Sequence, residues 1–459
     1  MRSRATLAWA AYLVPAAALA LYAVGRWFVA LADRTPVLYG EGAVANAAGL
    51  ARAGVAYLDV DPQRFVAANY PPLYFHLASI GDPFISGRIA SIAATLLVAA
   101  IVFASARPAG ALVAAALGAG WLAVAPVMIW GPALKPDLVA LALTAVAVAT
   151  LDRRRELAPI GGFALVFAAL AKPTALLPAA ALVAWLAWSD RPTLGRFGFG
   201  AAVAVVAAAV TVYLDSVPDV WRHVVTWNAL SWSTEQALSV AIIGLMVIGL
   251  PILIAAFMRG FGGARAAYLL GAVAIVVAAG REGATINYLL DLAVAVMLSL
   301  AAIAPKLRTS ALIPLALLAQ LVIGTVVLDP LGVLPGRAPT TGAWSDPFRG
   351  GAVDLAFRQD ARYLVEDSGL LARTGISPVV DDLFLWSRLV DRGLISADPI
   401  VNQVREAQIN SVIALTDLEH LDAAPAFERQ RWSATLVRTV LDRYRLARHV
   451  GDLWIYEPR

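Results

Sequence analysis

Long apolar stretches are the feature of this sequence that most constrains its fold. Within the first 330 of its 459 residues, largely apolar runs of about 15 to 25 residues follow one another, separated by short polar loops. An α-helix needs about 20 such residues to cross the hydrocarbon core of a bilayer. Eleven runs fit this description, at residues 7–30, 85–105, 110–129, 137–151, 158–171, 174–188, 197–214, 236–257, 266–280, 288–304 and 311–328. They predict an α-helical polytopic membrane protein with about eleven transmembrane helices.

Composition supports this fold class and excludes others. The chain is 60% hydrophobic and 15% charged, whereas an ordinary soluble domain is about half apolar and about a quarter charged. A soluble enzyme, a disordered scaffold and a coiled-coil rod are therefore excluded. A membrane β-barrel is disfavoured because its strands alternate apolar and polar residues. The absence of cysteine excludes disulfides and thiolate metal sites.

Charged residues in the loops predict how the spans are oriented. Arginine and lysine gather in alternate loops, which places those loops in the cytoplasm; they are Arg2, Arg4, Arg107, Arg153, Arg154, Arg155, Arg191, Arg196, Arg259, Arg265, Lys306 and Arg308. The opposite loops contain the acidic residues Glu41, Asp59, Asp61, Asp82, Asp137, Asp215, Asp219 and Glu282. We therefore expect a cytoplasmic N-terminus and an extracytoplasmic C-terminus in the cytoplasmic membrane. Membrane orientation also explains the net charge of +4 without nucleic acid as a partner.

The composition changes near residue 330, which predicts two domains, 1–330 in the membrane and 331–459 outside it. A Pro- and Gly-rich linker from Leu334 to Gly351 leads into the second domain, which has ordinary polarity. Its short apolar runs predict strands at Ser377–Val380, Ser411–Leu415 and Leu453–Tyr456, and helical periodicity predicts a helix over Arg431–Tyr444. These elements indicate a small α/β domain.

Polar residues near the membrane surface are candidates for function because they are costly at membrane depth. Glu41 lies between two glycines in the first outer loop, where it could take a proton from a hydroxyl nucleophile. The segment Asn69–Tyr74 precedes the second span and contains Tyr70, two prolines and Tyr74. Its prolines fix an extended turn. Each tyrosine alone would also suit the aromatic belt of a membrane interface.

Two further outer turns combine cations with polar groups. In Trp130–Asp137, Asp137 follows a proline and could cap the next helix, while Lys135 could hold a phosphate. The turn Arg281–Tyr288 includes Glu282 and Asn287 as well, and Asn287 and Asp291 have the i, i+4 spacing of one helix face.

Two other features admit more than one interpretation. Lys172 is an isolated cation between two short spans, and it either belongs to the same site or extends to the interface. The loop 215–236 carries Trp221, Arg222, His223, Trp227 and Trp232. Such a loop is typical of an interfacial segment, and the alternative is that it walls a lipid-linked substrate.

These residues, in this order, resemble the GT-C superfamily of integral-membrane glycosyltransferases, and most closely the bacterial branch of protein O-mannosyltransferases and lipid A aminoarabinose transferases. The resemblance covers residues 5–330. Glu41 matches the acidic residue of the first loop, the presumed base of the family. Many relatives have an Asp-Glu pair there, whereas Gly40 precedes Glu41 here. Asp137 matches the second-loop acidic position, which helps to hold a divalent cation in some relatives.

The resemblance implies an inverting transferase that uses a sugar linked to a polyprenyl phosphate on the outer face of the membrane. The acceptor would be a polysaccharide, a lipid or a protein, and a divalent cation is a possible cofactor. Because the leaving group is already a phosphate, such a site needs a base and cations rather than a strong acid. The residues expected to bind substrate are Asn69, Tyr70, Tyr74, Lys135, Asp137, Lys172, Arg222, Arg281, Glu282 and Asn287.

Two other classes of function compete with this hypothesis. A transporter or lipid flippase would also have many spans, but it usually has two related halves with matching broken helices, and no such repeat is visible here. An inactive anchor that presents the outer domain to a partner would not require Glu41 or Lys135.

Overall fold

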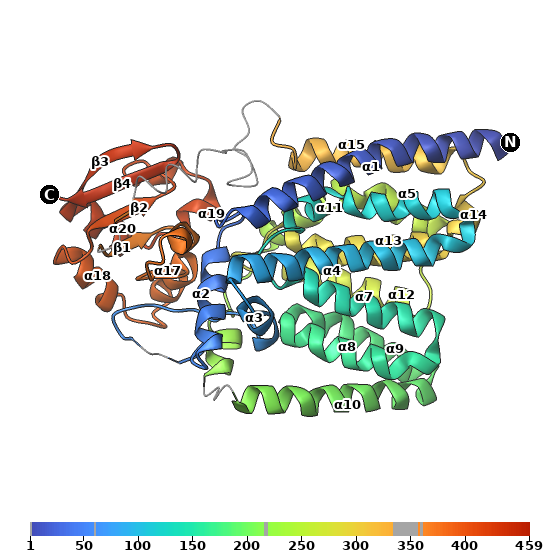
Figure 1. Cartoon of the computed structure of the whole chain (residues 1–459), viewed down its shortest axis with the longest axis horizontal. Coiled ribbons are helices and arrows are strands. Elements are labelled where there is room, and N and C mark those ends of the chain that lie inside the picture. Colours follow the sequence, from blue (N-terminus) through green and yellow to red (C-terminus); the bar gives the residue numbers. More distant parts are fainter. Residues whose placement is uncertain (1, 59–60, 215–218, 334–356, 359–360) are drawn as a thin grey trace.

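The computed structural model describes residues 2–58, 61–214, 219–333, 357–358 and 361–459, and it has two parts (Figure 1). One is a bundle of long helices, and the other is a small domain packed against one end of the bundle, which we name the domain-facing end. The bundle helices are α1 (Arg2–Ala32), α4 (Pro83–Ala106), α5 (Ala111–Leu122), α6 (Ala125–Trp130), α7 (Asp137–Arg153), α8 (Ala158–Ala171), α9 (Leu176–Ser189), α10 (Arg191–Leu214), α11 (Thr234–Phe257), α12 (Ala264–Ala278), α13 (Leu290–Ala302), α14 (Ala304–Leu307) and α15 (Leu312–Leu328). Helix therefore forms in every predicted span.

The bundle helices are apolar, and many of their outward side chains are hydrophobic. Among the described residues, four helices are long and apolar enough to cross a membrane, at Arg4–Ala32, Pro83–Ala109, Arg191–Ala209 and Thr234–Phe257. Exposed apolar side chains such as Leu21, Phe28 and Leu245 lie on these helices. An apolar outer surface around an apolar core is expected of helices that face lipid.

Small residues let some helices approach closely. A Cβ on Gly162 of α8 would lie 2.0 Å from the carbonyl oxygen of Phe197, and one on Gly200 of α10 would lie 1.8 Å from that of Pro159. Only glycine fits at either position, so α8 and α10 pack with their backbones in contact, as is common for helices in membranes.

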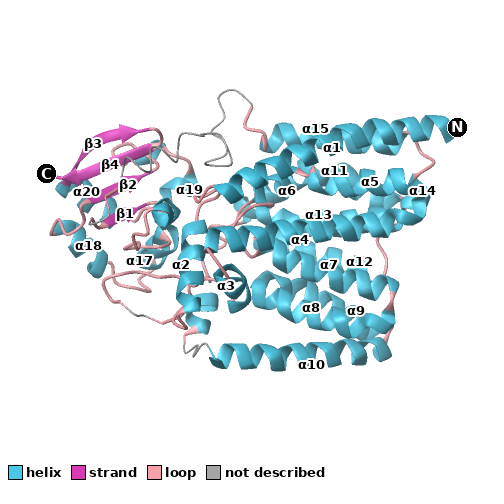
Figure 2. Cartoon of the chain, viewed as in Figure 1, coloured by secondary structure: helices cyan, strands magenta, loops and turns pink. Residues whose placement is uncertain are grey.

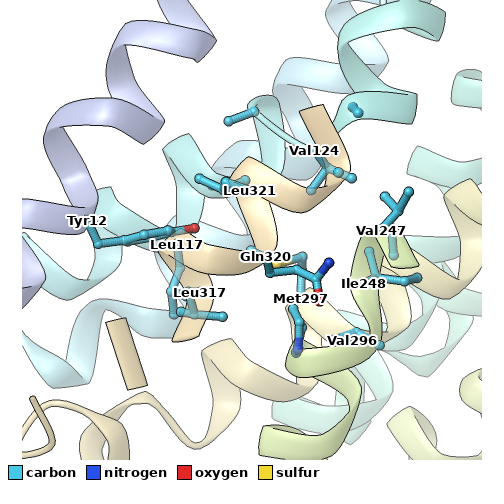
Figure 3. Close-up of a pocket in the computed structure, with 16 residues that line it drawn as sticks. Tyr12, Leu117, Val124, Val247, Ile248, Val296, Met297, Leu317, Gln320 and Leu321 are labelled. Atoms are coloured by element: carbon cyan, nitrogen blue, oxygen red, sulfur yellow. The ribbon is translucent and has the colours of Figure 1, made fainter. Parts of the chain in front are cut away.

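Gln320 is a buried polar residue whose role is structural. Its side-chain amide in α15 accepts a hydrogen bond from the Leu250 N–H at 2.8 Å and donates one to the Met246 carbonyl at 2.5 Å. These two backbone groups would otherwise bond to each other within α11, just before Pro251. Figure 3 shows Gln320 in a largely apolar cavity of the bundle. Gln320 thus supplies hydrogen-bond partners to backbone groups of α11 beside its proline.

The domain-facing end carries short elements between the long helices. They are α2 (Glu41–Arg52), α3 (Pro72–Ser79), the 3₁₀ helices η3 (Pro173–Ala175) and η5 (Ile286–Leu289), and the π-helical turn η4 (Arg222–Thr226). In Figure 1, the N-terminus and α14 lie at the opposite end of the bundle. The loops predicted to be extracytoplasmic and those predicted to be cytoplasmic are therefore separated along the bundle axis.

The C-terminal domain is a small α/β structure, as predicted, with a four-stranded sheet (Figure 2). The strand order is β1 (Tyr363–Val365), β2 (Ser411–Ala414), β4 (Leu453–Pro458) and β3 (Tyr444–Val450). The β1–β2 pair is parallel and the others are antiparallel. The remaining elements are η7 (Ser368–Arg373), α17 (Leu383–Asp391), α18 (Asp398–Arg405), η8 (Leu421–Ala423), α19 (Ala426–Arg429) and α20 (Ala434–Arg443).

The predicted elements of this domain were partly correct. The strands at 411–415 and 453–456 and the helix at 431–444 are confirmed by β2, β4 and α20. The predicted strand Ser377–Val380 is wrong, because this segment forms only a single bridge between Val380 and Phe65 of the first outer loop. The predicted linker, 334–351, lies outside the described residues.

Tight contacts join the two parts. A Cβ on Gly42 of α2 would lie 2.0 Å from the Gly369 backbone nitrogen, so α2 meets η7 with no space for a side chain. The buried carboxylate of Asp381 accepts hydrogen bonds from the Ala67 N–H at 3.0 Å and the Asn46 side-chain amide at 3.1 Å. The segments at the domain-facing end of the bundle thus form part of the packing of the C-terminal domain.

Candidate active site

Glu41, the predicted base, is the first residue of α2 and is fully buried. Its Oε2 accepts hydrogen bonds from the Val37 N–H at 2.6 Å and from Arg88 Nη2 at 2.8 Å. Its Oε1 accepts one from the Leu134 N–H at 2.5 Å. Both carboxylate oxygens are therefore occupied, and the side chain has no exposed surface in this conformation.

Arg88 completes this buried ion pair. The guanidinium, also 0% exposed, donates to the carbonyls of Ala30 and Asp33 at 2.5 Å and of Thr35 at 2.8 Å. A buried charge pair needs such additional hydrogen bonds to offset its desolvation. Through Arg88 and Glu41, the end of α1, the start of α2, α4 and the turn before α7 are held together. This arrangement suits an organising role for Glu41, and its predicted role as base stays a prediction.

Asp137, Lys172 and Asn287 form a compact polar cluster, although they lie in three separate connections. Lys172 Nζ and Asn287 Nδ2 each lie 2.6 Å from Asp137 Oδ1. Asp137 is 6% exposed and Lys172 is 8% exposed. Lys172 does not extend to the interface, and Asp137 does not cap α7, whose N-cap is Pro136.

The second oxygen of Asp137 is the notable feature of this cluster. Asp137 Oδ2 is buried, and it accepts no hydrogen bond from any described residue. Such a group is costly unless a ligand or water satisfies it. It lies at a small cavity that is also lined by Thr144, Lys172, Asn287 and Asp291. Asn287 and Asp291, whose i, i+4 spacing predicted a common helix face, therefore line the same cavity.

Arg281 joins the cluster through Tyr288. Its Nη2 donates to the Tyr288 hydroxyl at 3.3 Å, and Lys172 Nζ lies 4.8 Å from the centre of the Tyr288 ring. Arg281 Nη1 also donates to the Asn228 carbonyl at 2.8 Å. Two cations therefore contact Tyr288, Arg281 at its hydroxyl and Lys172 at its ring.

Lys135 belongs to the same end of the bundle. Its carbonyl accepts a hydrogen bond from the Ser91 hydroxyl at 3.1 Å, and Ser91 in turn lies 3.0 Å from the Tyr74 hydroxyl. Tyr74 is fully buried and also donates to the Gly87 carbonyl. Tyr74 therefore supports the backbone around Lys135 through Ser91, and its role in substrate binding stays a prediction.

Asn69 and Tyr70 lie beside the cluster. Asn69 Oδ1 is buried and receives no hydrogen bond from the described residues, while the Asn69 carbonyl accepts one from Asn228 at 3.0 Å. Burial raises the pKa of Tyr70, and Asp137 raises it further. Tyr70 is therefore within electrostatic range of the Asp137 cluster.

Arg222 and Glu282, two residues predicted to bind substrate, contact other groups. Arg222 pairs with Asp219 at 3.2 Å and lies over the Trp227 ring at 5.3 Å. Glu282 is half-buried, and its backbone N–H donates to the Ser231 carbonyl. Arg222 and Glu282 both remain predictions as substrate-binding residues.

Sequence reasoning missed several groups that the tertiary structure brings to this end. Arg88 was detectable, because an arginine inside an apolar run is a functional or structural candidate by default. The sequence identified Tyr288 only as the last residue of the turn Arg281–Tyr288. Asp382, from the C-terminal domain, gave no signal, because nothing in its local sequence links it to the membrane part.

The described residues offer little to hold a metal ion. They contain no group of three or more His, Asp or Glu side chains close enough for that purpose. Asp137 Oδ2 could supply a single ligand, and Asp137 Oδ1 is already bonded to Lys172 and Asn287.

The helical bundle, the short elements at its domain-facing end and the packed α/β domain together form a fold that is similar to that of ArnT. ArnT from Cupriavidus metallidurans in the apo state superposes with a TM-score of 0.59 at 14% sequence identity, over 95% of this chain and 96% of ArnT. ArnT bound to undecaprenyl phosphate gives a TM-score of 0.57 at 14% identity, over 95% and 97% of the two chains. The Archaeoglobus fulgidus oligosaccharyltransferase reaches only 0.45 at 12% identity, over 98% and 74%. No protein-family profile and no curated protein sequence matches the chain.

Proposed function

We propose that this protein is an inverting glycosyltransferase of the cytoplasmic membrane, which moves a sugar from a polyprenyl-phosphate donor to an acceptor hydroxyl on the outer face. The observation that carries the proposal is the cluster of Asp137, Lys172, Asn287 and Arg281 at the domain-facing end. It combines cations with a buried, unsatisfied carboxylate oxygen, and it lies within a fold shared with a transferase that has been solved with undecaprenyl phosphate.

The cluster has the chemistry that transfer from a lipid phosphate requires. As the bond between the anomeric carbon and the phosphate oxygen breaks, negative charge grows on the phosphate. Lys172 and Arg281 can stabilise that charge, and fixed cations in a water-poor site are effective at this. An ammonium has three donor hydrogens, so Lys172 can bind phosphate while it stays paired with Asp137. Asp137 Oδ2 can accept a hydrogen bond from a sugar hydroxyl.

A divalent cation could bind through Asp137 Oδ2 only if the donor phosphate supplied most of its other ligands. Mg²⁺ is often held in this way, by one or two carboxylates and substrate phosphates. Because the described side chains provide so few ligands, no step of the proposed reaction depends on a metal. Transfer measured with and without a chelator tests this point.

The proposal is tested with detergent-purified protein, a panel of labelled polyprenyl-phosphate sugars and a membrane extract as acceptor. Binding of undecaprenyl phosphate is measured in parallel. Lys172→Met and Arg281→Met should each lower transfer at least about 100-fold, in line with the loss of one group that stabilises transition-state charge. Lys306→Met, which removes an exposed cation at the opposite end, is the matched control and should transfer like the wild type.

The outcomes separate the competing functions. Transfer with one donor, lost in both cluster variants but not in the control, supports the enzyme and identifies its sugar. Binding of undecaprenyl phosphate without transfer, with an acceptor extract known to support a related transferase, would favour a transporter or flippase. Absence of both binding and transfer would favour an anchor protein.

A further inference from the structure

Gly40, which has no side chain, leaves a space beside the polar cluster. Gly40 precedes Glu41 with φ of 78°, a left-handed conformation that favours glycine. A Cβ built on Gly40 would lie 2.8 Å from Lys135 Nζ. The Lys135 ammonium thus occupies the space next to residue 40, and residue 40, a glycine, provides no carboxylate there.

A carboxylate reaches this space from the C-terminal domain instead. Asp382 is the N-cap of α17 and accepts a hydrogen bond from the Leu385 N–H at 3.0 Å. The Tyr39 hydroxyl, next to Gly40 in the chain, donates to Asp382 Oδ1 at 3.4 Å and accepts from the Phe384 N–H at 2.9 Å. Two hydrogen bonds across the domain boundary therefore fix Asp382 against the first outer loop.

Asp382 and Lys135 both lie at the Tyr39–Gly40 turn, because Tyr39 donates a hydrogen bond to Asp382 and a Cβ on Gly40 would lie 2.8 Å from Lys135 Nζ. Burial lowers the pKa of Lys135, and Asp382 opposes this effect more strongly than Glu41 or Asp137. Burial likewise raises the pKa of Asp382, and Lys135 counteracts that rise. Lys135 lies two residues before Asp137, in the turn that leads into α7, so Asp382 and the Asp137 cluster adjoin the same turn.

We propose that Asp382 is the carboxylate that accepts the proton of the acceptor hydroxyl, so that the C-terminal domain completes the active site. This inference rests on the proposed glycosyl transfer. The acceptor oxygen forms a bond to the anomeric carbon as its O–H bond breaks, and the proton passes to Asp382. The bond from the anomeric carbon to the phosphate oxygen breaks, and its electron pair leaves with the polyprenyl phosphate, beside Lys172 and Arg281. Protonated Asp382 then returns the proton to solvent.

The other carboxylates are less suited to this step. Glu41 has no exposed surface, and both its oxygens are occupied by Arg88 and two backbone N–H groups. Asp137 Oδ1 is held by Lys172 and Asn287, and its Oδ2 is the oxygen proposed above to accept a hydrogen bond from a sugar hydroxyl. Asp382 is 7% exposed, and its raised pKa makes it a better proton acceptor than an ordinary aspartate once it is ionised.

The experiment compares Asp382→Asn with the wild type in the transfer assay, with binding of undecaprenyl phosphate and thermal unfolding measured alongside. Asparagine is as good an N-cap as aspartate, so α17 should persist. We expect kcat to fall at least about 100-fold, with the Kd for undecaprenyl phosphate within about threefold of the wild type. The wild-type rate should rise with pH as the base ionises, and the residual rate of the variant should lack this limb. Asp442→Asn, an exposed carboxylate of the same domain, is the matched control and should transfer like the wild type.

Several results would overturn the assignment. Transfer by Asp382→Asn within threefold of the wild type would show that Asp382 is not the base, and the proposed glycosyl transfer would stand. A parallel loss of transfer, undecaprenyl phosphate binding and unfolding temperature would make Asp382 a structural cap only. Absence of transfer by the wild type itself would refute the proposed function, an outcome distinct from both.

Discussion

Removal of Arg88 tests whether Glu41 organises the fold or performs chemistry. Arg88→Met keeps an unbranched side chain of similar length but removes the charge that pairs with Glu41 at 2.8 Å. The carboxylate would then be buried with only the Val37 and Leu134 N–H groups as donors. The carbonyls of Ala30 and Thr35, among others, would also lose their hydrogen bonds.

The size of the effect follows from the burial of both partners. Leaving one partner of a buried ion pair unpaired typically costs about 3–5 kcal/mol. Arg88 additionally bonds three backbone carbonyls, and each lost hydrogen bond costs about 1 kcal/mol. We therefore expect Arg88→Met to lower the free energy of unfolding by about 6–8 kcal/mol. The double variant Glu41→Leu/Arg88→Met should cost clearly less than the sum of the single changes, because no unpaired charge remains.

Equilibrium unfolding in mixed dodecyl maltoside and SDS micelles, followed by the fluorescence of the 13 tryptophans, measures these differences. A single-variant cost near 1 kcal/mol, or strict additivity in the double variant, would refute the structural reasoning. Transfer activity separates the two roles of Glu41. Measurable transfer by the folded double variant would fit an organising role, whereas complete loss with a stable fold would favour Glu41 as the base.

Three further predictions follow from the packing and charges. Gly42→Ala should destabilise the docked C-terminal domain by several kcal/mol and speed its proteolysis, because the added Cβ would lie 2.0 Å from a backbone nitrogen of η7. Gly49→Ala on the same helix has open space, and it should be neutral or stabilising by about 0.5–1 kcal/mol; equal proteolysis of the two variants would contradict the contact. Burial, reinforced by a neighbouring aspartate, raises the pKa of Asp381 to about 7, so the folded state holds its proton more tightly than the unfolded chain. Stability should therefore fall as pH rises from about 4 to about 7, and pH-dependent unfolding of Asp381→Asn should lack this component; an unchanged slope would exclude Asp381 as its source. Lys172→Met leaves Asp137 without its cation and should weaken undecaprenyl phosphate binding at least tenfold, measured by fluorescence quenching, while unchanged affinity would remove Lys172 from the phosphate site.

The sequence predicted the parts of this protein that depend on local composition. Apolar runs long enough for a bilayer predicted helices, and every run contains one, because hydrocarbon leaves the backbone few alternatives to helix. The turns that carry Lys135, Asp137 and Asn287 were identified for the same reason, since polar residues interrupt apolar runs visibly. The predicted strand at Ser377–Val380 failed because its apolar residues pack against an outer loop rather than pair in the sheet.

Only the tertiary structure decided which of these residues meet. Glu41 and Arg88 are 47 residues apart, Asp137 and Asn287 are 150 apart, and Tyr39 and Asp382 are 343 apart. Contacts over such separations arise from the packing of helices and from the docking of one domain on another, and no local pattern encodes them. The sequence therefore predicted Glu41 to be an accessible base. In the structure, packing buries Glu41 in an ion pair with Arg88. The same packing brought Asp382 of the C-terminal domain into contact with Tyr39, because burial of the α2 surface against η7 fixes the position of that domain.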